Sequence, residues 1–274
     1  MRLGITPKIQ TVRHCHEVGW IPLLMSSTVL FEQQNGIARL SFNRAEKHNA
    51  LGHEELAGIE KALESIDETT RVLVVTSESG RTFCAGADLG QINEGLLSGE
   101  RFQAATNLIA GLPIPTLCVI NGNIFGGGVE LAVSCDFRVA AEDIMMRVPA
   151  AAIGLCYPID GIERLVNRLG VSLAKRILVA AEEFSAAEMK ALGIVNWTSP
   201  ASELTVVAME YAQQLASGAP LAVRSMLRII GEAESGSIDR RAADELVALC
   251  AGSKDLKEGL VAQRERRKPI FTGQ

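Results

Sequence analysis

The stretch Asn121–Asp136, N-G-N-I-F-G-G-G-V-E-L-A-V-S-C-D, decides how the chain is organised. It follows an apolar run at residues 116–120, T-L-C-V-I, which predicts a buried strand. The glycines Gly126–Gly128 end the strand pattern, and the residues after them favour a helix. A turn of this kind offers unpaired N–H groups to an anion or a developing oxyanion. The spacing fits neither a P-loop nor the dinucleotide fingerprint, and close packing of helix on strand explains it equally well.

One carboxylate, Glu130, stands among apolar residues one turn into this expected helix. A lone carboxylate in such a place is either desolvated for a purpose or a burden on the fold. Glu130 is therefore a candidate site residue.

Composition argues against several classes of protein. The 274 residues suffice for one large domain or two small ones, and the hydrophobic fraction of 47% supports a large core. A formal net charge of −5 argues against nucleic-acid binding, and 4% aromatic residues argue against a base-stacking or sugar-binding surface. The six cysteines form no C-x-x-C pair, which is typical of reduced core cysteines rather than of a disulfide or zinc framework. No apolar run is long enough to span a bilayer, so we expect a cytoplasmic protein without a membrane partner.

The first 24 residues differ from the rest, because they are basic and poor in acids. A basic presequence fits this composition, whereas a secretory signal does not, since its apolar region is missing. His14 and His16 have no further ligands nearby, so no metal site is expected. A start at Met25 would make the segment an upstream extension. We expect three parts: a loosely ordered extension over residues 1–24, a core over 25–198 and a helical region over 199–274.

Periodicity predicts an α/β core followed by helices. Asn35-Gly36 between two apolar stretches predicts a hairpin, and the β-branched run at residues 72–76 predicts another buried strand. Helices are expected over residues 53–68, 91–110 and 161–169, and short strands over 137–140, 145–148 and 195–198. Two helix starts have the spacing of a capping box: Asp160 with Glu163, and Ser185 with Glu188.

Three motifs follow one another along the chain. They are Asn43-Arg44-x-x-Lys47-x-Asn49-Ala50-Leu51, Phe83-x-Ala85-Gly86-Ala87-Asp88-Leu89 and Asn121-Gly122-x-x-x-Gly126-Gly127-Gly128-x-Glu130-Leu131. Together they resemble the crotonase superfamily, whose best-known members are enoyl-CoA hydratases and isomerases, from about Thr28 to Phe271. The resemblance implies a spiral of β-β-α turns with two nearly perpendicular sheets, a C-terminal helical region that forms trimer contacts, and a coenzyme-A thioester as substrate.

The resemblance also implies roles for single residues. The family's oxyanion hole consists of two backbone N–H groups, which fall on Ala87 and Gly127; no metal and no separate cofactor is implied, because this hole is the electrophile. Glu130 matches one of the two glutamates of the hydratases and is expected to be the main acid–base residue. Substrate contacts are expected at Lys47 near the phosphates, at backbone groups around Ala85 and Leu89 near adenine and pantetheine, at Ala87, Gly126 and Gly127, and at Arg266 in a basic tail that can reach a neighbouring subunit's coenzyme.

The sequence departs from the hydratases at their second glutamate. Ala150 occupies that place, and alanine neither donates nor accepts a proton. Addition of water to an enoyl thioester needs a base for the water and an acid at the α-carbon, so standard hydration is in doubt. The following turn is altered as well. Its carboxylate, Asp160, is either a helix cap or a substitute acid, and nothing in the sequence fixes the direction of Tyr157.

Three functions stay open. The chain is a hydratase or isomerase relative, or another thioester enzyme such as a hydrolase, decarboxylase or dehalogenase, or an acyl-CoA-binding protein without activity. Glu130 beside an intact glycine turn favours the two enzymes. We expect a homotrimer, or a hexamer of two trimers, because the C-terminal helices, with Leu246, Val247 and Leu249, carry more apolar surface than a tail alone could bury.

Overall fold

The computed structural model describes residues 22–24, 26–78 and 80–274. Most of the extension expected over residues 1–24, with both of its histidines, lies outside the described residues. Its end, Pro22–Leu24, forms strand β1, which pairs antiparallel with β2 (Val29–Gln34). The larger sheet therefore begins inside the segment that we expected to be loosely ordered.

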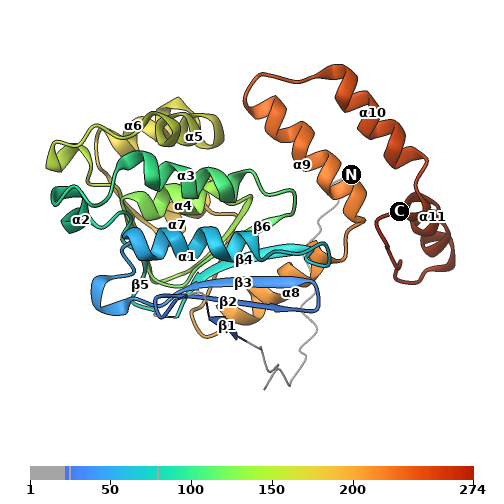
Figure 1. The fold of residues 1–274 in the computed structure, drawn as a ribbon, viewed down its shortest axis with the longest axis horizontal. Helices are drawn as coiled ribbons and strands as arrows, with labels where there is room; N and C mark the ends of the chain where they lie inside the picture. Colours follow the sequence, from blue (N-terminus) through green and yellow to red (C-terminus); the bar gives the residue numbers. More distant parts are fainter. Residues whose placement is uncertain (1–21, 25, 79) are drawn as a thin grey trace.

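Two sheets form the frame of the described chain (Figure 1). The larger has the strand order β1-β2-β3-β4-β6-β8-β11, and the smaller has the order β10-β9-β7-β5. The remaining strands are β3 (Ile37–Phe42), β4 (Val72–Ser77), β5 (Thr82–Cys84), β6 (Thr116–Ile120), β7 (Asn123–Phe125), β8 (Phe137–Ala141), β9 (Met145–Arg147), β10 (Glu183–Ser185) and β11 (Trp197–Ser199). The successive pairs β4/β5, β6/β7 and β8/β9 each give one strand to each sheet and are followed by helices. This is the expected spiral of β-β-α turns.

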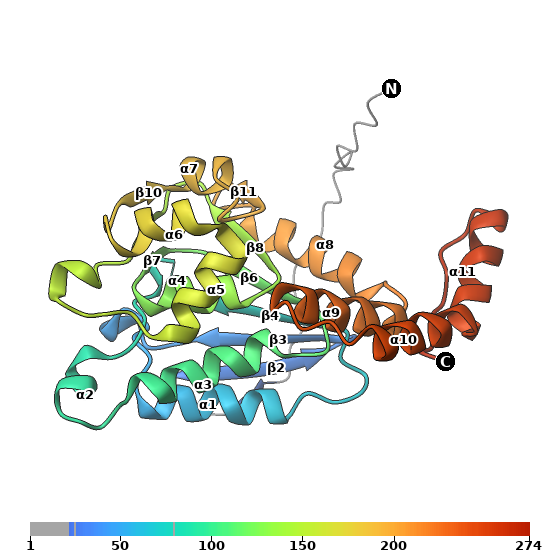
Figure 2. The same ribbon diagram turned by 90° about the horizontal axis from the view of Figure 1, so that it is seen from above.

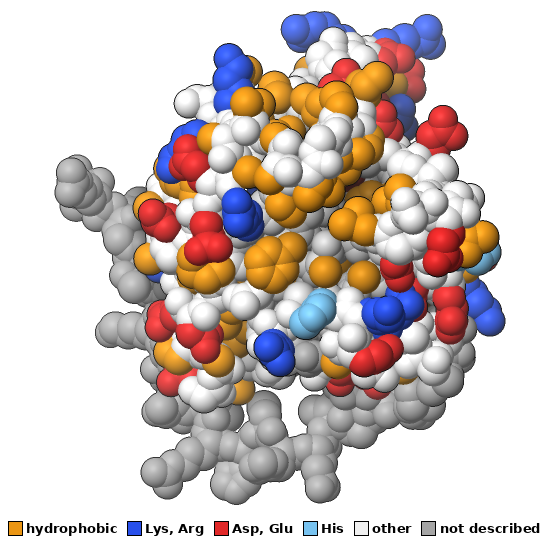
Figure 3. All heavy atoms as spheres, turned by 90° about the vertical axis from the view of Figure 1, so that its left-hand side faces the viewer, with side chains coloured by type: hydrophobic (Ala, Val, Ile, Leu, Met, Phe, Trp, Pro, Cys, Tyr) orange, Lys and Arg blue, Asp and Glu red, His pale blue; other side chains and the backbone are white. Residues whose placement is uncertain are grey.

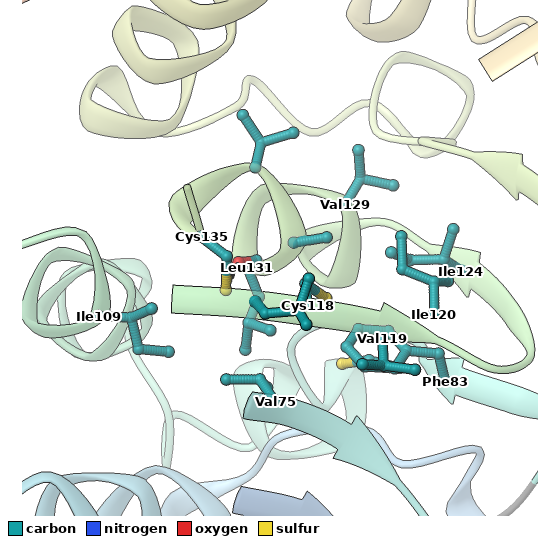
Figure 4. Packing of buried hydrophobic residues seen from close by; sticks show 14 of the residues in the cluster. Val75, Phe83, Ile109, Cys118, Val119, Ile120, Ile124, Val129, Leu131 and Cys135 are labelled. Carbon is teal, nitrogen blue, oxygen red and sulfur yellow. Dashed lines mark hydrogen bonds between the residues drawn. The ribbon is translucent and has the colours of Figure 1, made fainter. Parts of the chain in front are cut away.

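The middle of the larger sheet carries the core. Strands β4 and β6 run parallel to each other, and every residue of both is buried, which explains their uninterrupted apolar sequences. Helix α4 (Gly127–Ser134) lies against β6. In Figure 4 the side chains of Leu131 and Cys135 meet those of Cys118 and Val75 from the two strands. The segment that follows the glycine turn is thus fixed by core packing.

The hairpin is confirmed. Strands β2 and β3 pair antiparallel up to Gln34 and Ile37, and Asn35 and Gly36 between them have positive φ angles of 52° and 77°. A two-residue turn with both central residues in this region matches the twist of the strands that it joins.

The helices cover the sheets and then leave them. In addition to α4 they are α1 (His53–Glu64), α2 (Leu89–Asn93), α3 (Gly99–Ala110), α5 (Ile159–Leu169), α6 (Val171–Leu178), α7 (Ala186–Ala191), α8 (Leu204–Ala216), α9 (Pro220–Glu234), α10 (Arg240–Ala251) and α11 (Lys254–Glu265), with short 3-10 turns at Ala45–Lys47 and Ala151–Ile153. Helix α8 packs on the larger sheet, whereas α10 and α11 extend away from both sheets in two perpendicular views (Figures 1 and 2). None of the helices in the described part is long and apolar enough to cross a membrane.

The helix expected over residues 91–110 is two helices, α2 and α3. Gly95 ends the first with a left-handed φ of 71°, and the Ser98 side chain caps the second by accepting a hydrogen bond from the Arg101 amide at 3.2 Å. The capping box of Ser185 and Glu188 at the start of α7 is confirmed.

Candidate active site

Two turns meet at one edge of the smaller sheet. Strands β5 and β7 are parallel neighbours, so the turns that follow them leave the sheet at the same edge. Gly86 lies in the first turn with a φ of 86°, and a Cβ built on it would stand 2.3 Å from the amide nitrogen of Gly127 in the second. Only glycine permits this approach.

The amides of Ala87 and Gly127 are the unpaired N–H groups of these turns. Leu51 forms a parallel bridge with Ala87: its amide donates to the Gly86 carbonyl at 2.8 Å, and its carbonyl accepts from the Asp88 amide at 3.0 Å. The N–H of Ala87 therefore points away from Leu51. Gly127 is the first residue of α4, where amides have no partner within the helix. Neither amide donates to an acceptor among the residues that the structure describes.

Arg44 and Asn49, from the first motif, form an ion pair and a hydrogen bond with the segment that carries the second motif. The Arg44 guanidinium pairs with the Asp88 carboxylate at 3.0 Å, and the Asn49 side chain donates to the Thr82 carbonyl at 2.8 Å. Burial alone would raise the pKa of Asp88, but hydrogen bonds from the Gln91 amide and from Arg44 hold it below its usual value. Asp88 is thus a charged anchor for the turn that carries Ala87.

Glu130 is buried, with 1% of its surface exposed. Its Oε1 accepts hydrogen bonds from the Thr106 hydroxyl and the Arg164 guanidinium, both at 2.9 Å. Gln103 Nε2 lies 3.0 Å from both carboxylate oxygens. Helix α3 supplies the amide and hydroxyl, and α5 supplies the guanidinium. The Oε1 of Gln103 is buried without a hydrogen-bond partner among the described residues, so an acceptor stays open beside the carboxylate.

Burial and this carboxylate shift the pKa values of two titratable neighbours, Tyr157 and Arg164. Burial raises the pKa of Tyr157 well above its usual value, and the charge of Glu130 raises that pKa further. The hydroxyl therefore keeps its proton in the resting enzyme. Burial lowers the pKa of Arg164, and the charge of Glu130 opposes this shift. Since arginine is the most basic side chain, Arg164 stays a cation.

Gly161 lets the start of α5 pass close to this group. A Cβ built on Gly161 would stand 2.5 Å from Tyr157 Cε1 and 2.6 Å from Glu130 Oε2. Both distances are shorter than any ordinary carbon contact. Glycine at this position therefore brings the tyrosine ring and the second carboxylate oxygen to one point.

The expected coenzyme contacts fall into two regions. The Ala85 amide donates to the carbonyl of His48 at 3.1 Å, so Lys47, which is exposed, lies beside the turn that carries Ala87. Leu89 opens α2 after the same turn and is 56% exposed. Gly126 begins the second turn with a φ of 51°. Arg266 ends α11, at the opposite end of the molecule from α2 (Figure 1).

Apolar side chains surround this edge of the molecule. Figure 3 shows hydrophobic side chains gathered around a hollow on the side where α2 and the loop before α5 lie. The exposed apolar residues of these two segments are Leu89, Ile92, Leu96, Ile153, Leu155 and Ile159.

Ala150 lies under the loop before α5. It is 5% exposed, and its carbonyl accepts hydrogen bonds from the amides of Ile153 at 3.2 Å and Leu155 at 2.9 Å. Its side chain is a buried methyl group, at the position where the resemblance implies the second glutamate of the hydratases.

The capping role expected for Asp160 with Glu163 is wrong. Helix α5 begins at Ile159, and its N-cap is Pro158, with a φ of −60° and no side-chain cap. Proline, with fixed φ and no N–H, fits a helix start, so the helix begins earlier than expected. Asp160 lies in the first turn, is exposed and accepts a hydrogen bond from Asn107 Nδ2 at 2.8 Å. It lines a cavity of about 760 Å³ beside α3, α5 and α9.

Sequence reasoning missed three of the residues that contact Glu130: Gln103, Thr106 and Arg164. The available signal was the pair Gln103 and Thr106, polar residues three apart on the buried face of an amphipathic helix. In the part of the chain that the structure describes, no group of three or more His, Cys, Asp or Glu side chains is arranged to hold a metal.

Comparison with known proteins identifies the family of the chain. The sequence pattern of the family described as enoyl-CoA hydratase/isomerase matches residues 32–274. A crotonyl-CoA hydratase of Syntrophomonas wolfei subsp. wolfei is 31% identical over 252 residues, which cover 89% of this chain and 97% of the relative. The mitochondrial enoyl-CoA hydratase domain-containing protein 2 of Bos taurus is 34% identical over 254 residues, 87% of this chain and 85% of the relative.

Solved structures share the fold. The crystal structure of an enoyl-CoA hydratase/carnithine racemase from Magnetospirillum magneticum has a TM-score of 0.85 and 26% identity over 91% of this chain and 97% of its own. An enoyl-CoA hydratase from Bacillus anthracis has a TM-score of 0.79 and 29% identity over 90% of this chain and 100% of its own. The chain therefore belongs to the enoyl-CoA hydratase/isomerase family of the crotonase superfamily, and it is a thioester enzyme of the lyase or isomerase type.

Proposed function

We propose that this enzyme moves a proton at the carbons next to the carbonyl of an acyl-CoA thioester. The observation that carries the proposal is the contact of the two turns, which brings the unpaired amides of Ala87 and Gly127 to one edge, with Glu130 one turn further along α4. Two such amides stabilise the charge that develops on the thioester oxygen when an α-proton leaves. Glu130 takes this proton as a base and returns it as an acid.

The methyl group of Ala150 favours a proton shift over hydration. Hydration needs one group to activate water and another to protonate the α-carbon. Migration of a double bond moves a proton between two carbons of the same substrate, so one acid–base group is enough. We therefore propose an enoyl-CoA isomerase type of reaction, with slow hydration, that needs no metal and no cofactor beyond the coenzyme A of the substrate.

The coenzyme is proposed to lie along the turn that carries Ala87. Lys47 is exposed there and supplies positive charge for the phosphates, while backbone groups around Ala85 and Leu89 bind adenine and pantetheine. The apolar rim of Figure 3 suits the acyl chain. Arg266 lies at the far end of the molecule, so its proposed partner is the coenzyme on another copy of the chain.

We propose that the chain forms a homotrimer, or a hexamer of two trimers, through helices α9–α11. These helices extend away from the sheets and expose large apolar side chains (Figure 2). The most exposed of them are Met226, Ile230, Val247, Leu249 and Leu260, each between 55% and 61% exposed. An apolar surface of this kind is typical of an interface.

Replacement of Gly86 by alanine tests the oxyanion hole. The new Cβ would collide with the Gly127 amide, so the two turns must separate, and we expect turnover to fall by about 100-fold or more. Gly95→Ala is the control, because Gly95 also has a positive φ but open space around it. Both variants carry the backbone strain, about 1–2 kcal/mol, and only Gly86→Ala has the clash. Equal turnover in the two variants would argue against the oxyanion hole.

Glu130→Gln tests the acid–base role. We expect acyl-CoA binding, measured by calorimetry, to stay nearly unchanged, because the amide keeps the shape of the carboxylate. Turnover of an enoyl-CoA panel should fall by about 100-fold or more. In the natural protein we expect slow hydration of crotonyl-CoA. Unchanged turnover in Glu130→Gln would remove this residue from the mechanism, and rapid hydration of crotonyl-CoA would contradict the preference for a proton shift.

Asp160 is a candidate substitute for the missing glutamate, and it lines the cavity beside α9 together with Arg164. Asp160→Asn keeps an acceptor for Asn107 and loses a charge in the first turn of α5. We expect a loss of stability below about 1 kcal/mol and turnover within twofold of the natural enzyme. Denaturation and steady-state kinetics measure the two. A large fall in turnover at normal stability would make Asp160 a catalytic carboxylate.

Light scattering tests the assembly. We expect a mass of about three or six times the chain mass of 29.3 kDa. Val247→Asp places a charge on the exposed face of α10 and should lower that mass, whereas Val171→Asp, at a position of similar exposure on α6, should not. A natural protein with the mass of one chain would contradict the proposal.

A further inference from the structure

The carboxylate of Glu130 has most of its hydrogen-bond donors on one oxygen. Oε1 accepts from the Thr106 hydroxyl and the Arg164 guanidinium, both at 2.9 Å, and from Gln103 Nε2 at 3.0 Å. Among the residues that the structure describes, Oε2 accepts only from the same Gln103 amide, also at 3.0 Å. A carboxylate has about four lone-pair sites, two on each oxygen, so three donors fill Oε1 while Oε2 keeps a site open.

Helix α3 supplies two of these donors from its buried face. Gln103 and Thr106 are three residues apart on this helix and are 6% and 1% exposed. The Thr106 hydroxyl lies 3.0 Å from the backbone carbonyl of Gln103 and accepts a hydrogen bond from Arg164 at 3.2 Å. The groups that bind Oε1 are therefore connected to one another as well as to Glu130.

The same helix contacts the start of α4. Gly127 lies three residues before Glu130 on α4, so the two residues share a face of that helix. A Cβ built on Gly127 would stand 2.5 Å from the ring of Phe102, which precedes Gln103 on α3, and α3 lies beside α4 (Figure 1). One helix therefore sets the position of the carboxylate relative to the Gly127 amide.

The orientation of the Gln103 amide is explained by Glu130 and not by the hydrogen bonding of the amide itself. Nε2 faces the carboxylate, because an ionised carboxylate accepts hydrogen bonds and donates none. The Oε1 atom of Gln103 is then buried without a partner among the described residues. A buried acceptor without a donor is unfavourable, and exceptions of this kind are expected at functional sites.

We infer that Gln103 and Thr106 are positioning residues that hold Oε1 of Glu130 and leave Oε2 as the oxygen that exchanges a proton with the substrate. The inference rests on the proposed function, and it adds the identity of the reacting oxygen and of the two residues that select it. Neither residue is assigned a contact with the substrate, so both act through Glu130.

The proton transfer at Oε2 balances. Oε2 forms a bond to the α-proton, and the electron pair of the broken C–H bond enters the enolate, whose oxygen is proposed to be held by the amides of Ala87 and Gly127. The proton then leaves Oε2 and bonds to another carbon of the substrate, which takes an electron pair back from the enolate. Glu130 is again an anion, and the donors on Oε1 stay in place throughout.

Exchange of the substrate's α-hydrogen for deuterium tests the role of Thr106. The natural enzyme and its variants are incubated in D₂O with saturated and unsaturated acyl-CoA of several lengths, and exchange is followed by NMR. Thr106→Val removes the hydroxyl and keeps a similar shape. We expect it to slow exchange by about 10-fold or more, because the carboxylate is no longer held in position, with acyl-CoA binding unchanged by calorimetry. Thr106→Ser restores the hydroxyl and should recover most of the lost exchange.

Two variants test Gln103. Gln103→Met keeps the length of the side chain and loses both N–H groups, whereas Gln103→Asn keeps the amide on a shorter side chain that cannot reach both oxygens. We expect each to slow exchange by about 10-fold or more with acyl-CoA binding unchanged. In Gln103→Met/Glu130→Gln exchange should be no slower than in Glu130→Gln alone, because Gln103 acts through the carboxylate.

A second threonine–glutamine pair provides the control. Thr70 is 2% exposed, and its hydroxyl donates to Oε1 of Gln33 at 2.6 Å, outside the candidate active site. Thr70→Val removes a buried hydrogen bond of the same kind, so it should lower the melting temperature about as much as Thr106→Val does. Its exchange should stay normal.

The outcomes separate this inference from the proposed function. If the natural enzyme exchanges hydrogen, Glu130→Gln does not, and Thr106→Val and Gln103→Asn exchange normally, the inference is wrong and the proposed function stands. If the natural enzyme shows no exchange, or Glu130→Gln exchanges normally, both fail. Loss of acyl-CoA binding in the Gln103 variants would assign that side chain to substrate binding. That result, an equal loss of exchange in Thr70→Val, or a Thr106→Ser as slow as Thr106→Val would each overturn the positioning role.

Discussion

A negative charge inside the fold has to be balanced there, so the buried carboxylate of Glu130 constrains the helices that supply its partners. The side chain is 1% exposed, and Arg164 carries the positive charge that pairs with it. Removal of one partner from such a buried pair costs about 3–5 kcal/mol in other proteins, because the other charge stays behind without compensation. Since Thr106 and Gln103 come from α3 and Arg164 from α5, the positions of both helices relative to α4 are tied to this carboxylate. The charge that we propose for the chemistry thus also fixes the packing of three helices.

The glycines of the turn are needed for close packing, and the same packing sets the position of the first amides of α4. A Cβ on Gly127 would stand 2.5 Å from the Phe102 ring, and one on Gly128 would stand 2.4 Å from the Cys84 carbonyl oxygen. Close packing, which explained the three glycines as well as anion binding did, is therefore real. It is also what leaves the first amides of α4 beside the turn that contains Gly86. The two interpretations of the sequence describe one arrangement, because backbones can approach this closely only where side chains are missing.

The sequence predicts correctly those elements whose formation depends on residues close together in the chain. Uninterrupted β-branched runs gave the buried strands, and Asn35-Gly36 gave the hairpin, since both patterns act within a few residues. The single helix expected over residues 91–110 is divided at Gly95, whose φ is positive. The N-cap of α5 is Pro158 and not Asp160. The partners of Glu130 lie 24 to 34 residues away in the chain, so their convergence depends on how α3 and α5 pack and is absent from any local pattern. The family resemblance indicated the site but not these contacts.

The two carboxylate oxygens of Glu130 have different contacts, and this difference bears on the proposed class of reaction. Oε1 is committed to Thr106 and Arg164 and serves the fold, while Oε2 lies beside Gly161 and the tyrosine. A hydratase needs a second polar group to hold and activate water, and we propose that the buried methyl group of Ala150 stands in its place. A proton shift needs no such group: the same acid–base unit can release at one carbon the proton that it took from another. Because Oε2 accepts only the shared Gln103 amide among the described residues, and because Ala150 is proposed to stand in the hydratase position, the proposed reaction moves a proton within the substrate rather than adding water to it.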